Sequence, residues 1–430
     1  MPNTFIEEKM KKVAAFNGIE VFHIQTEQFK TNTINVFFQD NLSKENATKN
    51  ALLPAVMRRG CERYPTFQEI ALYLENLYGA IFDCGVNKKG ERQIIQFYME
   101  FVSHQYTLDE VNMFEKAFEL LYEIITKPLV DKQAFKKEYV EQEKENLKKL
   151  IESRVNDKVQ YATEKCFEEM CKGEPFEIYE NGSISDLSAI DEKNLYQYYE
   201  SAIKTLPMSI FITGQLDKKL IDKMIQVFSQ IKRENMKPVG NGLIFKEVTE
   251  VKQFTEKMSV NQAKLSLGFR TNIAPDDSCY YSLLVYNGIL GGGMHSKLFQ
   301  NVREKESLAY YTFSRLEKFK GLMIISGGIE SQNKDKAQRI ILEQMEEMKK
   351  GNITDYEYDA TLKTIETGIK SLRDGQMQIV DFYLSQTIAG TEDSFESIIE
   401  KTKKVSREDV IKIAQKIKLD TIYFLESAES

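Results

Sequence analysis

The sequence predicts an α+β protein made of two homologous tandem α/β sandwich domains. One observation behind this is that the order of predicted strands and helices in the first half recurs in the second half. The other is that short alternating strands are separated from long amphipathic helices in each half. The chain has 430 residues, of which 42% are hydrophobic, so it can fill two separate cores. We therefore expect two antiparallel or mixed sheets, each covered by helices.

The first half begins with a predicted strand at residues 32–39, where side chains alternate as in a half-buried strand. A helix follows and ends near Met57–Gly60, where the glycine suits a C-terminal cap. A second helix is predicted at Phe67–Leu77, because Thr66 and Glu69 occupy the positions of a capping box. Within its first 80 residues the chain therefore changes from the two-residue period of a strand to the 3.6-residue period of a helix.

Three more elements complete the first half. Residues 93–100 read as a strand, a long helix is predicted at Lys132–Ser153, and a closing strand is predicted at residues 207–213. Apolar side chains along the helix recur at spacings of three, four and seven, as they do on one face of an amphipathic helix.

The second half repeats this order. A strand at residues 263–269 precedes a helix at Tyr280–Leu290, and three consecutive glycines follow that helix. A strand at residues 321–326, an amphipathic helix through residues 358–372 and a closing strand at residues 420–425 complete the repeat. The repetition predicts that each half folds around its own sheet.

The domain boundaries follow from a charged, irregular stretch between the two halves. It contains Pro238 and two nearby glycines, which are typical of a linker. We expect a first domain at residues 1–231, a linker at residues 232–258 and a second domain at residues 259–430.

Composition restricts the function classes. The chain carries 58 Lys and Arg against 65 Asp and Glu, and this net charge of −7 argues against broad nucleic-acid binding. Five scattered cysteines contain no CxxC pair, so neither a zinc ribbon nor a disulfide framework is predicted. No apolar run reaches the length of a membrane span, and the first residues do not read as a secretion signal. We expect a cytoplasmic protein without a membrane span.

One segment of the second half carries a family resemblance. It reads Gly291-Gly-Gly-Met-His-Ser-Lys-Leu-Phe-Gln-Asn-Val-Arg-Glu-Lys-Glu-Ser-Leu-Ala-Tyr310. It resembles the second-domain signature of the M16 peptidase family, which includes pitrilysin, insulinase and the mitochondrial processing peptidase. The resemblance implies the M16/LuxS-like metallohydrolase fold, with two homologous domains in each chain. It also implies that two chains, or two linked halves, enclose a peptide-binding chamber.

The family's zinc motif is missing from this sequence. Active members carry His-x-x-Glu-His on an early helix, where the two histidines bind zinc and the glutamate activates water. The chain has only three histidines, His23, His104 and His295. Aligned with the family, Ala51, Pro54 and Ala55 occupy the positions of His, Glu and His. The resemblance therefore implies a degenerate, non-catalytic subunit that holds no cofactor of its own, with zinc expected only in a partner.

The second-domain residues of the family site are retained. In the family an Arg and, seven residues later, a Tyr reach toward the substrate at the zinc site, and the match places them at Arg303 and Tyr310. A guanidinium can bind a peptide carbonyl or carboxylate, and a phenol can donate to a developing oxyanion. Residue type alone favours a structural ion pair and a packed aromatic side chain, whereas the surrounding motif favours a role near the partner's substrate.

Three further features give weaker evidence about function. Tyr78–Val86 resembles the family's edge strand, which pairs with substrate backbone in active members, although structural packing is an equal alternative. The run Gly291–Gly293 lacks the remainder of a phosphate-binding motif, so close backbone approach or a flexible turn explains it better. His295 has no neighbouring ligands in sequence, so we expect a surface histidine or one that supports the site, not a metal ligand.

Two functional hypotheses remain. In the first, the chain is the non-catalytic subunit of a heterodimeric zinc peptidase for peptide or protein processing, inactive alone. Its partners are then a homologous M16 subunit with an intact His-x-x-Glu-His and a peptide substrate. In the second, it is a structural or peptide-binding scaffold without influence on hydrolysis. The retained Arg303 and Tyr310 favour the first hypothesis, because a scaffold does not need them.

Overall fold

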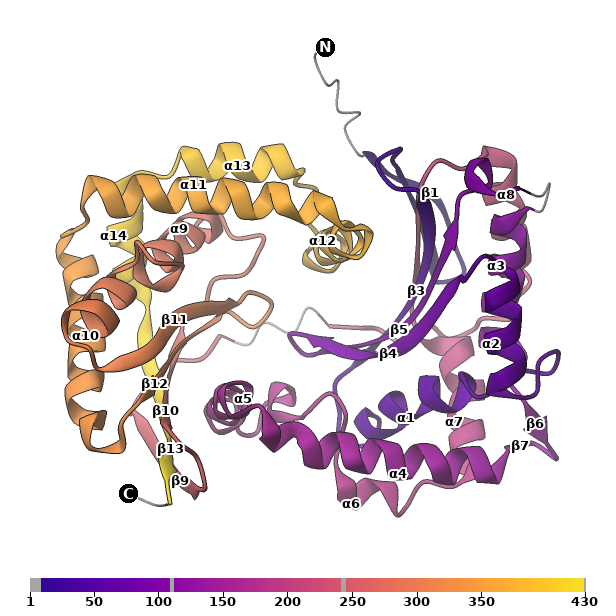
Figure 1. Ribbon diagram of the computed structural model, residues 1–430, viewed down its shortest axis with the longest axis horizontal. Coiled ribbons are helices and arrows are strands. Elements are labelled where there is room, and N and C mark those ends of the chain that lie inside the picture. The colour runs from indigo at the N-terminus through magenta and orange to yellow at the C-terminus, as the bar shows by residue number, and fades with distance from the viewer. Residues whose placement is uncertain (1–8, 109–111, 241–244, 429–430) are drawn as a thin grey trace, which may run out of the picture. The chain divides into compact units, whose positions relative to one another are not determined.

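The computed structural model describes residues 9–108, 112–240 and 245–428 (Figure 1). Contacts divide the chain into two compact units. The first contains Met1–Ser153 and Ile178–Gly240, and the second contains Arg154–Glu177 and Asn241–Ser430. No helix in the described ranges is both long and apolar enough to cross a membrane.

The first unit is built on a mixed sheet of six strands. In spatial order they are β1 (Lys9–Phe16), β2 (Ile19–Gln25), β8 (Met208–Thr213), β3 (Thr31–Asn41), β5 (Arg92–Val102) and β4 (Ile81–Lys89). The pair β2 and β8 is parallel, and the other pairs are antiparallel. The segment expected to form an edge strand therefore contains the start of β4, which does lie at the edge of the sheet.

Helices cover this sheet and share its core. They are α1 (Ala47–Met57), α2 (Phe67–Asn76), α3 (Met113–Thr126), α4 (Lys137–Ser153), α6 (Ile184–Leu187), α7 (Glu192–Thr205) and α8 (Lys218–Phe228). The predicted capping box begins α2: the Thr66 hydroxyl accepts from the Glu69 amide at 3.2 Å, and Glu69 accepts from the Thr66 amide at 2.9 Å. Alternate residues of β3, including Ile34 and Val36, pack against α1 and α3 in the core.

The second unit is built on a mixed sheet of five strands. In spatial order they are β11 (Ala309–Glu317), β12 (Leu322–Ile329), β10 (Ala263–Arg270), β13 (Lys418–Ser427) and β9 (Lys252–Met258). Only β13 and β9 are parallel. The helices are α5 (Lys158–Met170), α9 (Tyr280–Gly291), α10 (Lys334–Lys350), α11 (Asp355–Ser371), α12 (Gln376–Ala389), α13 (Phe395–Lys403) and α14 (Arg407–Lys416).

Both faces of this second sheet are buried. One face forms the main core with α9, α10 and α14. The opposite face packs against α5, which follows α4 in the sequence (Figure 1). The hydrophobic contacts on this face join Ala162 and Cys166 of α5 to Leu322 and Ile324 of β12.

The two sheets have the same topology, which confirms the predicted α+β fold of two homologous units. The order β2-β8-β3-β5-β4 in the first corresponds to β9-β13-β10-β12-β11 in the second, and in each the only parallel pair is the first. The second repeat therefore begins at β9, inside the stretch 232–258 that we expected to be a linker. Its strand character was hidden because only Phe254 and Met258 of its seven residues are apolar.

The structure differs from the local expectations in three places. Residues 154–177, inside the expected first domain 1–231, pack within the second unit. Helix α4 begins at Lys137 because a short hairpin of β6 (Val130–Asp131) and β7 (Ala134–Phe135) precedes it. Gly60 is not a left-handed cap. It is needed because a Cβ there would lie 2.3 Å from the Pro65 carbonyl oxygen.

Candidate functional site

Helix α1 carries the three residues that the family resemblance aligns with the zinc motif. Ala51 and Pro54 are buried and Ala55 is partly buried, and none of these side chains has an atom that could bind zinc. Pro54 lies inside the helix and has no amide hydrogen for the Asn50 carbonyl. The helix nevertheless continues past Pro54 to Met57, and the Arg58 amide donates to the Pro54 carbonyl at 3.0 Å. Across the described ranges, no three His, Cys, Asp or Glu side chains cluster so as to hold a metal.

A polar cluster lies beside these positions. The Asn50 amide donates to Asp40 at 3.2 Å and to Gln93 at 2.9 Å, and the Tyr198 hydroxyl donates to Asn50 at 2.6 Å. Lys237 forms an ion pair with the fully buried Asp40. Burial raises the pKa of Tyr198, so its phenol stays protonated. Because each buried group has a partner, this cluster fixes α1 against β3 and β5 and needs no ligand.

The segment between α9 and β11 carries the other two predicted residues. Arg303 lies on a π-helical turn, Phe299–Lys305, of a kind often found at functional sites. Its guanidinium lies over the Phe299 ring, 4.6 Å from the centroid, and its Nε is 3.8 Å from a carboxylate oxygen of Glu304. The Arg303 side chain is 42% exposed.

Tyr310 lies near the start of β11, the edge strand of the second sheet. It is 58% exposed, and its hydroxyl donates to Glu330 at 3.3 Å. In the described part of the chain no hydrogen bond or ion pair joins Arg303 to Tyr310. The structure therefore places both polar ends in solvent and holds them separately.

Buried contacts with α11 fix the segment that precedes Arg303. The Lys297 ammonium is 3.0 Å from Glu357, and both side chains are buried. The His295 ring lies 2.9 Å from the Thr361 hydroxyl. His295 is 6% exposed and burial lowers its pKa, so this neutral histidine supports the turn from inside and is not at the surface. Gly291 permits close approach, since a Cβ there would lie 2.4 Å from the Ser314 nitrogen.

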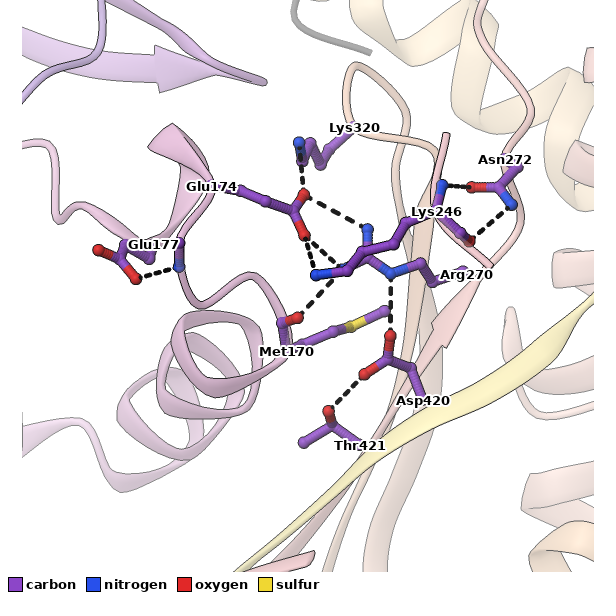
Figure 2. Close-up of polar contacts among 10 residues, drawn as sticks. Met170, Glu174, Glu177, Lys246, Arg270, Asn272, Lys320, Asp420 and Thr421 are labelled. Carbon is purple, nitrogen blue, oxygen red and sulfur yellow. Dashed lines mark hydrogen bonds and ion pairs between the residues drawn. The ribbon is translucent and has the colours of Figure 1, made fainter. Parts of the chain in front are cut away.

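A second charged cluster is buried under α5 and is not visible as a motif. Figure 2 shows Glu174 between Arg270 and Lys320, with Asp420 on the other side of Arg270. The ion-pair distances are 2.7 Å for Arg270 to Glu174, 2.8 Å for Lys320 to Glu174 and 2.9 Å for Arg270 to Asp420.

The charges in this cluster compensate each other. Burial alone would raise the pKa of Glu174, but hydrogen bonds and charges from Arg270 and Lys320 outweigh it and lower the pKa to about 2. Arg270 and Lys320 are almost fully buried and each is paired with a carboxylate, so the cluster offers no unpaired charge to a substrate. It attaches the segment after α5 to the sheet of the second unit.

The protein has two units of one topology, no zinc-binding side chains on α1, and an exposed Arg and Tyr in the second unit. Together these features define a protein of the metallopeptidase type that lacks the motif of an active member. Residues 189–365 match the family described as "Peptidase M16 inactive domain". The chain is 35% identical over 412 residues to "Probable inactive metalloprotease YmfF" of Bacillus subtilis (strain 168), with 96% of each chain covered. It belongs to the M16 peptidase family.

Solved structures share this fold. A conserved protein from Enterococcus faecalis V583 superposes with a TM-score of 0.90 at 30% identity, covering 98% of this chain and 99% of that one. A peptidase M16 inactive domain from Pseudomonas fluorescens superposes with a TM-score of 0.80 at 17% identity, covering 98% of both chains, and this second likeness shows the fold alone.

Proposed function

We propose that this chain is the non-catalytic subunit of a heterodimeric M16-type zinc peptidase. It is inactive alone, it completes a peptide-binding chamber, and Arg303 and Tyr310 act on the substrate at the zinc site of a homologous partner with an intact His-x-x-Glu-His. The observation that carries the proposal is the exposure of both polar ends on a segment whose base is fixed by the Lys297–Glu357 pair.

A purely structural role explains these two residues poorly. Arg303 forms its one ion pair within the described ranges with its sequence neighbour Glu304, and exposed pairs of this kind contribute only about 0–1 kcal/mol. The guanidinium therefore keeps donors for a carbonyl or carboxylate. The Tyr310 phenol can exchange its long hydrogen bond with Glu330 for one to a ligand.

The edge strand β4 supports peptide binding. Among the described residues no strand pairs with its outer edge, and peptides commonly bind by adding a strand to such an edge. Apart from Gly85 itself and its two sequence neighbours, no atom of the described residues lies within 4 Å of the position of a Cβ at Gly85, so a peptide backbone could approach this strand closely. All five cysteines are free, which is compatible with the cytoplasmic location that we include in the proposal.

The first test is recovery of the partner. The tagged protein is purified gently from its native cells, and its companions are identified by mass spectrometry. We expect a near one-to-one complex with a chain of similar length that contains His-x-x-Glu-His. Recovery alone, or only with other copies of itself, would contradict the heterodimer.

The second test separates the two functional hypotheses within that complex. Tyr310→Phe and Arg303→Met should each lower kcat, by roughly 10²-fold for loss of a donor to the transition state. Tyr356→Phe and Arg315→Met are matched controls, because Tyr356 is exposed elsewhere in the unit and Arg315 is exposed on β11. Unchanged kcat in all four intact complexes would favour the scaffold.

A further inference from the structure

The face of the second sheet that packs against α5 carries a group of polar side chains outside the site described above. On β10, alternate residues from Ala263 to Phe269 point into the main core, so Lys264 and Ser266 point to the α5 side. In the strand register, Ser266 is opposite Ser326 of β12, and Lys264 is opposite Gly328. The neighbouring strand β11 contributes Tyr311, which is opposite Gly328.

Lys264 differs from the other buried cations of this protein. It is only 7% exposed, and burial lowers its pKa. Three other buried cations, Arg270, Lys297 and Lys320, each form an ion pair with a carboxylate. Within the described ranges Lys264 has neither an ion pair nor a hydrogen bond. Its recorded polar interaction is with the Tyr311 ring, whose centroid is 5.6 Å from the ammonium.

Three hydroxyl groups on the same face are poorly satisfied. Ser266 Oγ, Ser326 Oγ and the Tyr311 hydroxyl are buried, and none makes a hydrogen bond of good geometry with a described residue, although the Tyr311 and Ser326 hydroxyls lie close enough to interact with each other. Burial raises the pKa of Tyr311 to about 12, with the charge of Asp157 acting in the same direction and a side-chain interaction with Ser326 acting against it, so the phenol is a neutral donor at physiological pH. Buried polar groups are normally satisfied, so three together require an explanation.

Gly328 keeps this group together. A Cβ at this position would lie 2.5 Å from Cε1 of Tyr311, so only glycine lets the aromatic ring lie against the sheet. In this position the ring is beneath the Lys264 ammonium and its hydroxyl is near Ser326. One cation and three hydroxyl donors, from three adjacent strands, therefore meet on one face of the sheet.

We propose that Lys264, Ser266, Ser326 and Tyr311 form a binding site for a carboxylate carried by a peptide, either its C-terminus or an acidic side chain. A carboxylate supplies the negative charge that Lys264 lacks and enough acceptor sites for the three hydroxyls. The identity of the ligand as a peptide rests on the proposed function, whereas the site itself does not.

The test is titration calorimetry on the full chain without any partner, so a missing partner or absent hydrolysis cannot affect the result. Three probes are compared: acetyl-Ala-Ala-Ala with a free C-terminus, the same peptide as an amide, and acetyl-Ala-Glu-Ala-amide. We expect one or both carboxylate probes to bind and the neutral amide not to bind. Binding of the first alone identifies a C-terminus as the source, and binding of the third identifies an acidic side chain.

Two variants connect that binding to the proposed site. Lys264→Met should weaken it by about tenfold or more, the lower end expected for a hydrogen bond to a charged group. Lys418→Met is the matched control, because Lys418 is an exposed lysine on β13 of the same sheet. Ser326→Ala should also weaken binding without altering charge, and it decides the question if Lys264→Met does not fold. Failure of both carboxylate probes to bind, equal binding of the neutral amide, or wild-type affinity in the folded variants would overturn the proposal.

Discussion

Glu174 is the carboxylate shared by two buried cations of the second unit, Arg270 and Lys320. Arg270 and Lys320 are 1% exposed or less by side chain, and both rely on its carboxylate. Replacing one partner of a buried ion pair leaves uncompensated charge in the interior, which costs more than the pair itself contributes. The side chain therefore controls the attachment of the segment 170–177 to the sheet.

We predict that Glu174→Gln lowers the free energy of unfolding by roughly 3–5 kcal/mol. The measurement is urea unfolding followed by circular dichroism. Glu346→Gln is the control, since Glu346 is 57% exposed in its pair with Lys349 and should change stability by less than about 1 kcal/mol. Equal stability of the two variants would show that the buried cluster contributes nothing specific.

The same carboxylate predicts a pH dependence. Its pKa is about 2 in the folded protein against an ordinary value of 4.5, so the folded state favours the charged form. The stabilisation is fully present above pH 4.5 and is lost as the pH falls through about 2. We expect the unfolding free energy of the wild type to fall more steeply over this range than that of Glu174→Gln. Identical slopes in urea titrations at successive pH values would contradict the assignment.

At the scale of elements, the contact between α11 and the turn before the π-helix supports Arg303. Lys297 donates to both oxygens of Glu357, and Glu357 also completes the capping box of α11 by accepting from the Thr354 amide at 2.8 Å. One side chain therefore both begins a helix and holds the neighbouring turn.

We predict that Lys297→Met destabilises the protein by roughly 3–5 kcal/mol, because Glu357 is left charged and buried. Adding Glu357→Gln should recover part of this loss, since the neutral amide can still accept from Thr354. Thermal unfolding of both variants measures the effect. A double variant less stable than Lys297→Met would indicate that the capping interaction outweighs the pair.

Sequence periodicity identified the elements whose pattern is local. Strands β3 and β10, helix α9 and the capping box of α2 lie where alternation or capping chemistry placed them. Strand β9 and the packing of α5 were missed because they depend on pairing with residues far away in the chain. An edge strand with few apolar residues has little local signal of its own.

The candidate residues also divide into those that a local sequence pattern predicts and those whose surroundings depend on distant parts of the chain. The glycine-rich signature singled out Arg303 and Tyr310, and the missing histidines were a direct observation on the sequence. Lys264 and Ser266 occupy the polar positions of an alternating strand, which predicts exposure to solvent. They are buried instead because the opposite face of the sheet packs against α5, a helix about 100 residues earlier.

At the scale of the whole molecule, the second unit is discontinuous in sequence. Its sheet needs residues 154–177 to cover one face, including Leu322, Ile324 and Leu425. The same segment supplies Glu174 to the buried cations. The second half alone therefore lacks both apolar cover and charge compensation.

We predict that a fragment of residues 241–430 is less stable and binds a hydrophobic dye, because one face of its sheet is uncovered. A fragment in which residues 154–177 precede residues 241–430 through a flexible linker should recover stability and lose the dye fluorescence. Linking a shuffled version of the 154–177 sequence is the control. Equal behaviour of all three fragments would show that α5 is dispensable.

The close packing of α5 also limits how relatives of this protein can exchange their halves. A Cβ at Gly268 would lie 2.8 Å from the sulfur of Met170 and 3.2 Å from the sulfur of Cys166. A recombination event at the junction between the halves would join a helix inherited from one parent to a sheet inherited from the other. These positions must therefore be inherited as a set, although about 100 residues of sequence separate them.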